Sequence, residues 1–185
     1  MRHREVDLVA RVLIGSAVRQ KPQVLDLFLR SITGLDTAGL DVEYVFIDDN
    51  LDCDESSGML RGFARSRSAR MIQCDCPAAH YVCDEITHHW QEDLVWRVAS
   101  HKDRLLDMAR DGRVDFIFLV DSDLVLHPRT LVHLVSLGLE VVSEVYWTKW
   151  EPNFPPLPQV WIRDQYTLYR AGRGESLGQQ EVAQR

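Results

Sequence analysis

The sequence predicts an α/β fold in which helices flank a mostly parallel, twisted sheet. Three short runs of apolar and β-branched residues, 9–14, 42–47 and 116–120, are typical of strands buried on both faces. Between the first two runs, residues 22–35 carry apolar side chains at near-helical spacing. Strand, helix and strand in this order predict a βαβ unit, with parallel strands and a right-handed crossover.

The first two helices follow from local signals. Pro22 suits the first turn of the helix at 22–35, and Gly34 suits its end. Residues 53–70 are expected to form the second helix, and residues 71–74 a further short strand.

A long amphipathic helix is expected at residues 90–109, before the third apolar strand. Its apolar stripe consists of Trp90, Leu94, Val98, Leu105 and Met108. The sequence Arg-Asp-Gly-Arg at 110–113 ends this helix, and the strand at 116–120 follows.

The last third of the chain gives weaker signals. A helix is expected at 128–137, a strand at 140–147 and another strand at 160–169. Regular structure is expected to stop where four prolines fall within residues 151–158. The pattern predicts one domain over residues 1–170 and a polar tail over residues 171–185.

Composition excludes several classes of function. The 185 residues carry a net charge of −7, which argues against a general nucleic-acid-binding protein. No apolar run approaches the length of a membrane span. Glu5, Asp7 and Arg11 interrupt the apolar segment that a secretory signal would need. We therefore expect a cytoplasmic protein, and the sequence leaves open whether it forms a homo-oligomer.

The four cysteines form no C-x-x-C pair. They are Cys53, Cys74, Cys76 and Cys83. This spacing favours reduced thiols over a zinc site or a disulfide, although three of the four are clustered.

An acidic pair, Asp121 and Asp123, follows the strand at 116–120 directly. Ligands of open α/β sheets bind at the carboxyl ends of the strands, and carboxylate oxygens there suit a hard divalent ion such as Mg²⁺ or Mn²⁺. Such an ion would stabilise the charge that develops on a leaving diphosphate. The D-x-D pattern alone is common on solvated loops, and the strand before it and Pro128 after it favour the metal site.

Four stretches in order make the chain resemble the family 2-like glycosyltransferases of the GT-A fold. The resemblance covers roughly residues 9–169, and its stretches are 12–20, 45–50, 99–105 and the D-x-D motif. Two further stretches, 87–90 and 147–150, resemble a bacterial subgroup of that family.

The resemblance implies metal-dependent transfer of a sugar from a UDP- or GDP-sugar to an unidentified acceptor, with inversion. It implies a nucleotide site made of Ser16, Arg19, Asp48, Asp49, Lys102 and Asp121, with Asp121 and Asp123 holding the metal. Lys102 would lie at the start of a basic helix, where the family has an arginine. No counterpart of the downstream acidic motif that supplies the family's general base is found before Arg185, so no catalytic base is assigned.

Other interpretations remain open for several residues. Asp48 and Asp49 suit turn or helix capping as well as nucleoside binding, and Lys102 suits a solvated helix face. For His88 and His89 a structural role is favoured over metal or acceptor binding. Trp147 and Trp150 could belong to the core or form a wall on which a sugar stacks.

Two alternative functions also remain open at this point. One is a non-catalytic nucleotide-binding or assembly module. The other, less favoured, is a nucleotidyltransferase, which would want a Gly-rich basic loop after the first strand. The sequence Gly-Ser-Ala-Val-Arg at 15–19 is a poor version of that loop.

Overall fold

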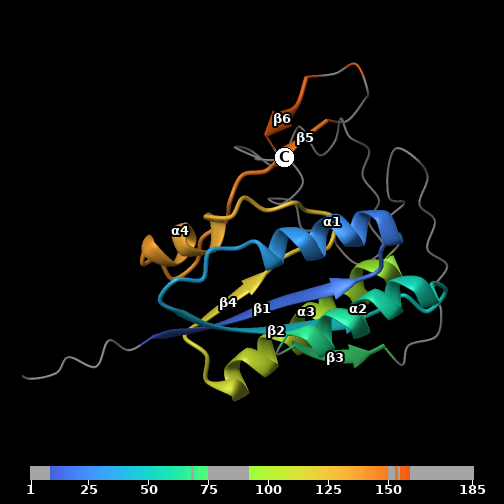
Figure 1. Cartoon of the computed structure of the whole chain (residues 1–185), viewed down its shortest axis with the longest axis horizontal. Coiled ribbons are helices and arrows are strands. Elements are labelled where there is room, and N and C mark those ends of the chain that lie inside the picture. The colour runs from blue at the N-terminus through green and yellow to red at the C-terminus, as the bar shows by residue number, and fades with distance from the viewer. Residues whose placement is uncertain (1–8, 68, 75–91, 150–152, 154, 159–185) are drawn as a thin grey trace, which may run out of the picture. The chain divides into compact units, whose positions relative to one another are not determined.

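A computed structural model describes residues 9–67, 69–74, 92–149, 153 and 155–158 of the chain. The chain divides into two compact units, Met1–Val142 and Ser143–Arg185. The first unit contains the predicted sheet, its helices and every described residue of the predicted nucleotide and metal sites (Figure 1).

The first unit is built on a four-stranded, all-parallel sheet with the strand order β3-β2-β1-β4. The strands are β1 (Ala10–Val18), β2 (Leu40–Asp48), β3 (Ala69–Gln73) and β4 (Phe116–Leu119). The helices are α1 (Pro22–Thr33), α2 (Asp54–Ser66), α3 (Glu92–Gly112) and α4 (Thr130–Ser136). This arrangement confirms the predicted α/β fold and is consistent with a Rossmann-like sheet.

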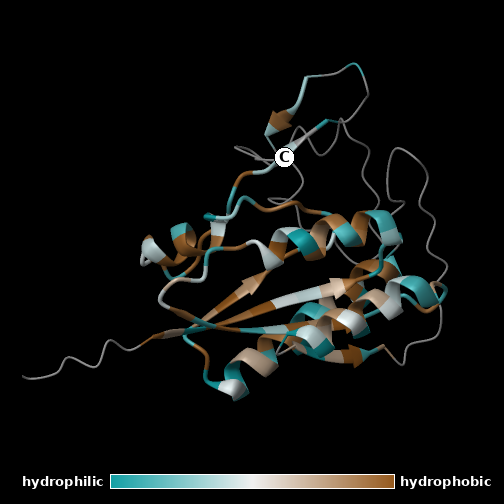
Figure 2. Cartoon of the chain, in the orientation of Figure 1, coloured by the Kyte–Doolittle hydropathy of each residue, from teal (hydrophilic) through white to brown (hydrophobic). Residues whose placement is uncertain are grey.

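Helices cover both faces of this sheet because its central strands are apolar on both sides. Val12 and Ile14 of β1 pack in the core cluster that contains residues of α1, α2 and α4. Leu13, between them, packs in a second cluster with Leu105 and Ala109 of α3. Successive strand residues point to opposite faces, so a strand buried on both faces is a continuous apolar run. Figure 2 shows the brown, apolar stretches of these strands and the mixed brown and teal residues of the helices around them.

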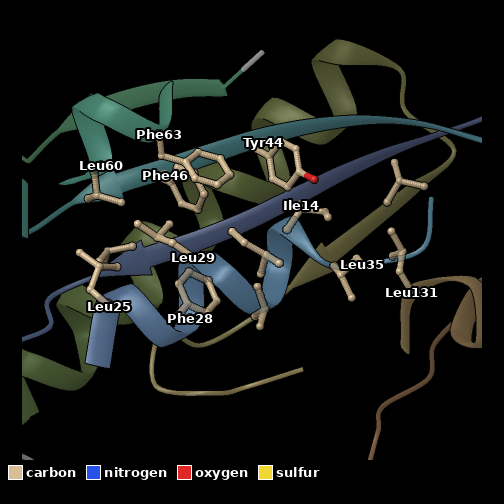
Figure 3. Packing of buried hydrophobic residues seen from close by; sticks show 14 residues of the cluster. Ile14, Leu25, Phe28, Leu29, Leu35, Tyr44, Phe46, Leu60, Phe63 and Leu131 are labelled. Atoms are coloured by element: carbon tan, nitrogen blue, oxygen red, sulfur yellow. The ribbon is translucent and has the colours of Figure 1, made fainter. Parts of the chain in front are cut away.

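The larger core cluster lies between the sheet and the helices α1 and α2. Figure 3 shows Phe63 of α2 beside the aromatic rings of Tyr44 and Phe46 of β2, and Phe28 of α1 among other side chains of the same cluster. Phe63 makes edge-to-face contacts with Tyr44 and Phe46, both at 5.4 Å between ring centroids. Such pairs contribute about 0.5–1.5 kcal/mol beyond the burial of their area, and they fix α2 against β2.

The smaller cluster depends on a glycine at the centre of β1. A Cβ atom at Gly15 would lie 3.2 Å from both terminal carbons of Leu105. Because Leu105 is fully buried, it has little room to move away. Gly15 therefore permits the close approach of α3 to β1.

Most predicted elements exist, with shifted ends. Strand β1 extends to Val18, beyond residues 9–14, because the small residues after Ile14 remain in the sheet. Helix α2 ends at Ser66, and helix α3 continues to Gly112.

The strand predicted at 140–147 is wrong. None of the described strands pairs with residues 140–146, and Val141 and Val145 are exposed. In the second unit, β5 (Trp147–Thr148) pairs antiparallel with β6 (Leu157–Pro158). β-Propensity without a neighbouring strand and a buried face does not make a strand.

The strand predicted at 160–169 and the tail at 171–185 lie outside the described residues. Among the described helices, none is both long and apolar enough to cross a membrane.

Candidate functional site at the carboxyl edge of the sheet

The predicted site residues gather at one edge of the first unit because its strands are parallel. Val18, at the end of β1, accepts a hydrogen bond from the backbone N–H of Asp49 at 2.9 Å. Asp48, at the end of β2, in turn accepts one from the N–H of Cys74, also at 2.9 Å. The chain order runs from β1 outward to β3 and then returns across β1 to β4. Ligands of open α/β sheets bind at the carboxyl ends where the strand order reverses.

The two carboxylate oxygens of Asp48 have different surroundings. Its side chain is fully buried, and its Oδ1 accepts hydrogen bonds from the backbone N and the Nδ2 of Asn50, at 3.1 and 2.8 Å. Among the described residues, nothing donates a hydrogen bond to the buried Oδ2. The turn-capping interpretation is therefore correct for Oδ1. Buried polar groups normally have a hydrogen-bond partner. Oδ2 of Asp48 is therefore a candidate acceptor for a donor group of a ligand.

The loops after β1 and β2 are fastened to each other beside Asp48. Gln20 donates its backbone N–H to Oδ1 of Asn50 at 2.8 Å, and its carbonyl accepts from the hydroxyl of Ser56 at 2.7 Å. Arg19, in the same loop, places Nη2 3.4 Å from Oδ2 of Asp52. Ser16 is buried within β1, two residues before the strand ends.

Asp49 faces the opposite side of the sheet, toward α3. Its Oδ1 accepts a hydrogen bond from Nη2 of Arg97, and its Oδ2 lies 3.8 Å from Nε2 of His101. Cys74 completes the group, with Sγ 3.6 Å from Nη2 of Arg97 and 3.9 Å from Nε2 of His101. All four side chains are buried. We call Asp49, Cys74, Arg97 and His101 the α3 cluster.

The α3 cluster holds Asp49 in its charged form. Burial by itself raises the pKa of Asp49, but the neighbouring His101 and Arg97 outweigh it, and the net pKa is lowered. For Arg97, burial alone lowers the pKa, but the carboxylate of Asp49 outweighs it and the pKa is raised. The pair is therefore a buried carboxylate and guanidinium, both ionised at neutral pH.

The acidic motif after β4 has a different environment. Asp121 and Asp123 are exposed on a turn, while Ser122 between them is buried. Nζ of Lys102 lies 3.1 Å from Oδ1 of Asp121. Lys102 stands in the middle of α3, so its predicted place at a helix start is wrong. The residue still reaches the acidic motif, because α3 packs against β4.

Arg97, His101 and Cys74 are not among the site residues predicted from the sequence. The buried stripe of α3 is Leu94, Arg97, His101, Leu105 and Ala109. Arg97 and His101 thus occupy positions of the apolar stripe, and two polar residues four apart on a buried face are a signal for a polar cluster. The signal for Cys74 is its position directly after a strand, at the edge of the sheet where ligands bind.

The remaining candidates fall outside the described residues or in the second unit. His88, His89 and Trp150 lie outside the described residues. Trp147 belongs to the second unit, where it is 66% exposed.

The described edge thus combines an exposed acidic turn, a nearby lysine, a buried acceptor and a buried polar cluster. This combination suits a ligand with anionic and hydrogen-bonding parts. Comparison of the chain with models of protein families and with curated proteins found no match.

Proposed function

We propose that the chain binds a nucleoside-diphosphate sugar and a divalent metal ion at this edge, as a glycosyltransferase of the GT-A fold. The observation that carries the proposal is the position of Asp121 and Asp123. They follow β4 where the strand order reverses, and Lys102 stands 3.1 Å from Asp121. Carboxylates beside an ammonium group suit a metal ion and the diphosphate that it bridges.

The donor set at the turn suits Mn²⁺ or Mg²⁺. Both carboxylates are exposed and offer hard oxygen ligands, which these ions prefer. A bound ion would stabilise the negative charge that develops on the departing diphosphate. In this proposal Lys102 leaves Asp121 and donates to a phosphate oxygen, as a flexible point charge can.

Asp48 supports the binding of the nucleoside part. Its Oδ2 is a buried acceptor without a partner among the described residues. The imide N–H of uracil or the ring N–H of guanine is a donor that would satisfy it. Arg19, in the loop after the neighbouring strand, carries a positive charge near the same edge. Asp49 is engaged by Arg97, so we assign the nucleoside contact to Asp48.

Binding and products together test the proposal. We expect a UDP- or GDP-sugar to bind in the presence of Mn²⁺, and we expect Asp121→Asn with Asp123→Asn to abolish this. The matched control replaces two exposed acids of α3, Asp103→Asn with Asp107→Asn, which should leave binding unchanged.

The products separate the enzyme classes. Release of nucleoside diphosphate from the sugar donor supports the transferase. Release of pyrophosphate from a nucleoside triphosphate with a sugar phosphate would instead indicate a nucleotidyltransferase. If no nucleotide or nucleotide sugar binds at all, the proposal fails.

A further inference from the structure

The α3 cluster brings together three residue types that bind transition metals. A carboxylate oxygen of Asp49, Sγ of Cys74 and a ring nitrogen of His101 all lie within 4.8 Å of one another, and all three residues are buried. They come from the end of β2, the end of β3 and the middle of α3. From this convergence we propose a second metal site, distinct from the acidic turn, in which Asp49, Cys74 and His101 hold Zn²⁺.

The geometry distinguishes a metal site from a catalytic relay. In a Cys–His–Asp relay the histidine uses one ring nitrogen for the nucleophile and the other for the carboxylate. Here the same atom, Nε2 of His101, faces both Oδ2 of Asp49 at 3.8 Å and Sγ of Cys74 at 3.9 Å. One nitrogen directed toward both a sulfur and an oxygen is compatible with ligands around a common ion.

The distances fit this interpretation. An N–O separation of 3.8 Å is too long for a hydrogen bond. Around a tetrahedral zinc, with bonds of about 2.0 Å to nitrogen and oxygen and about 2.3 Å to sulfur, ligand atoms are roughly 3.3–3.5 Å apart. The two separations from Nε2 of His101, 3.8 and 3.9 Å, exceed this by about half an ångström or less, and the oxygen of Asp49 and Sγ of Cys74 lie within 4.8 Å of each other.

Arg97 is compatible with a cation in this position because it uses the other carboxylate oxygen. Its Nη2 donates to Oδ1 of Asp49 and lies 3.6 Å from Sγ of Cys74. Residues that do not bind the metal themselves commonly donate hydrogen bonds to its ligands, and these hydrogen bonds orient the ligands. The carboxylate of Asp49 and a thiolate at Cys74 carry two negative charges against the two positive charges of Zn²⁺ and the one of Arg97, so the loaded site has a single net positive charge. Binding requires Cys74 as the thiolate.

The ligand chemistry selects the ion. A thiolate and an imidazole favour Zn²⁺ over Mg²⁺ or Mn²⁺, whereas the all-oxygen turn at Asp121 and Asp123 has the opposite preference. Of the described residues, three offer ligand atoms, so a fourth coordination position is available to water or another ligand. The competing explanation is that the Asp49–Arg97 ion pair is purely structural and the cluster binds no metal.

Cobalt is the probe for the test, because it replaces zinc and absorbs light when bound to a thiolate. We expect the reduced, metal-free full chain to bind one equivalent of Co²⁺ at the cluster. A near-ultraviolet thiolate-to-cobalt band should accompany binding, and one equivalent of Zn²⁺ should displace it. The acidic turn has no sulfur and cannot give this band. The band should therefore persist in Asp121→Asn with Asp123→Asn, which separates this site from the proposed function.

Matched variants locate the ligands. Cys74→Ser and His101→Ala should each lose the band, whereas Cys53→Ser and His133→Ala should keep it. Circular dichroism of each variant shows whether it is folded. The titration of the wild-type chain tests the proposal even if a variant does not fold. If no thiolate band forms, the cluster holds no metal and the ion pair is only structural. A band that survives in folded Cys74→Ser would also overturn the proposal.

Discussion

Nζ of Lys102 lies 3.1 Å from Oδ1 of Asp121 and joins the middle of α3 to the turn after β4. The two side chains are 41% and 65% exposed, so water screens their attraction and the pair contributes little to stability. In the proposed function, the ammonium group of Lys102 and the metal ion compete for the carboxylate of Asp121.

This competition predicts opposite effects of Lys102→Gln on two ligands. Without nucleotide, Mn²⁺ affinity should rise by up to about fivefold, the upper end for an exposed pair. With Mn²⁺ present, affinity for nucleoside diphosphate should fall, because a phosphate contact is lost. Calorimetric titrations measure both. Arg104→Gln, on the exposed side of the same helix, makes the same change in charge and should affect neither. Parallel losses of both affinities would contradict the assigned role.

Asp48→Asn should make the free protein more stable and weaken nucleotide binding. The change neutralises a fully buried carboxylate whose Oδ2 has no partner among the described residues, while Asn retains an oxygen for the turn at Asn50. Nucleotide affinity should fall roughly tenfold or more, as expected for a hydrogen bond to a charged group. Thermal unfolding and calorimetry measure the two effects. A lower melting temperature with unchanged affinity would show that the carboxylate has only a structural role.

Arg97→Met should destabilise the protein by about 3–5 kcal/mol, because it leaves the buried carboxylate of Asp49 without its partner. Urea denaturation gives the free energy of unfolding. Arg104→Met, exposed on the same helix, should change it by less than about 0.5 kcal/mol. Equal small effects would mean that the ion pair contributes little to folding.

The lowered pKa of Asp49 predicts a specific dependence of stability on pH. The unfolded chain binds a proton to this carboxylate at higher pH than the folded chain does. The stabilisation is therefore complete above the unfolded pKa, about 3.9, and is lost as pH falls through the lower folded value. Between pH 6 and pH 2.5, the free energy of unfolding should fall more steeply for wild type than for Asp49→Asn. Parallel curves would remove Asp49 from the acid response.

Gly15→Ala should destabilise by roughly 1–3 kcal/mol, the usual cost of overpacking a core, because its Cβ would meet Leu105 at 3.2 Å. Most of that cost should disappear in a Leu105→Ala background, where the methyl group enters the space left by leucine. A double-mutant cycle by urea denaturation measures this coupling. If the two effects simply add, the close contact is not the reason for glycine.

The sheet was predictable because its signals are local and repeated. Each central strand contains a short apolar run, residues 12–14 in β1 and 44–47 in β2, and Pro22 marks the first helix at its observed start. The strand predicted at 140–147 failed because strand formation depends on a distant partner. Residues 140–146 have no such partner among the described strands.

The sequence was sufficient to predict which strands end in acidic residues, but not what those residues contact. The sequence pattern did not distinguish Asp48 from Asp49, because adjacent residues differ only in the face to which they point. The structure separates them: Asp48 is held by Asn50, and Asp49 by Arg97. The α3 cluster depends on contacts between residues up to 52 positions apart, Asp49 and His101, which periodicity alone does not reveal.

Calorimetry with UDP and with GDP, each with and without Mn²⁺, tests the central claim most directly. We predict that one of the two nucleotides binds the wild-type chain with Mn²⁺ and binds much more weakly without it. The metal-dependent part should disappear in Asp121→Ala with Asp123→Ala. Binding that needs no metal, or that survives the double change unweakened, would contradict a metal-dependent nucleotide site at the turn after β4.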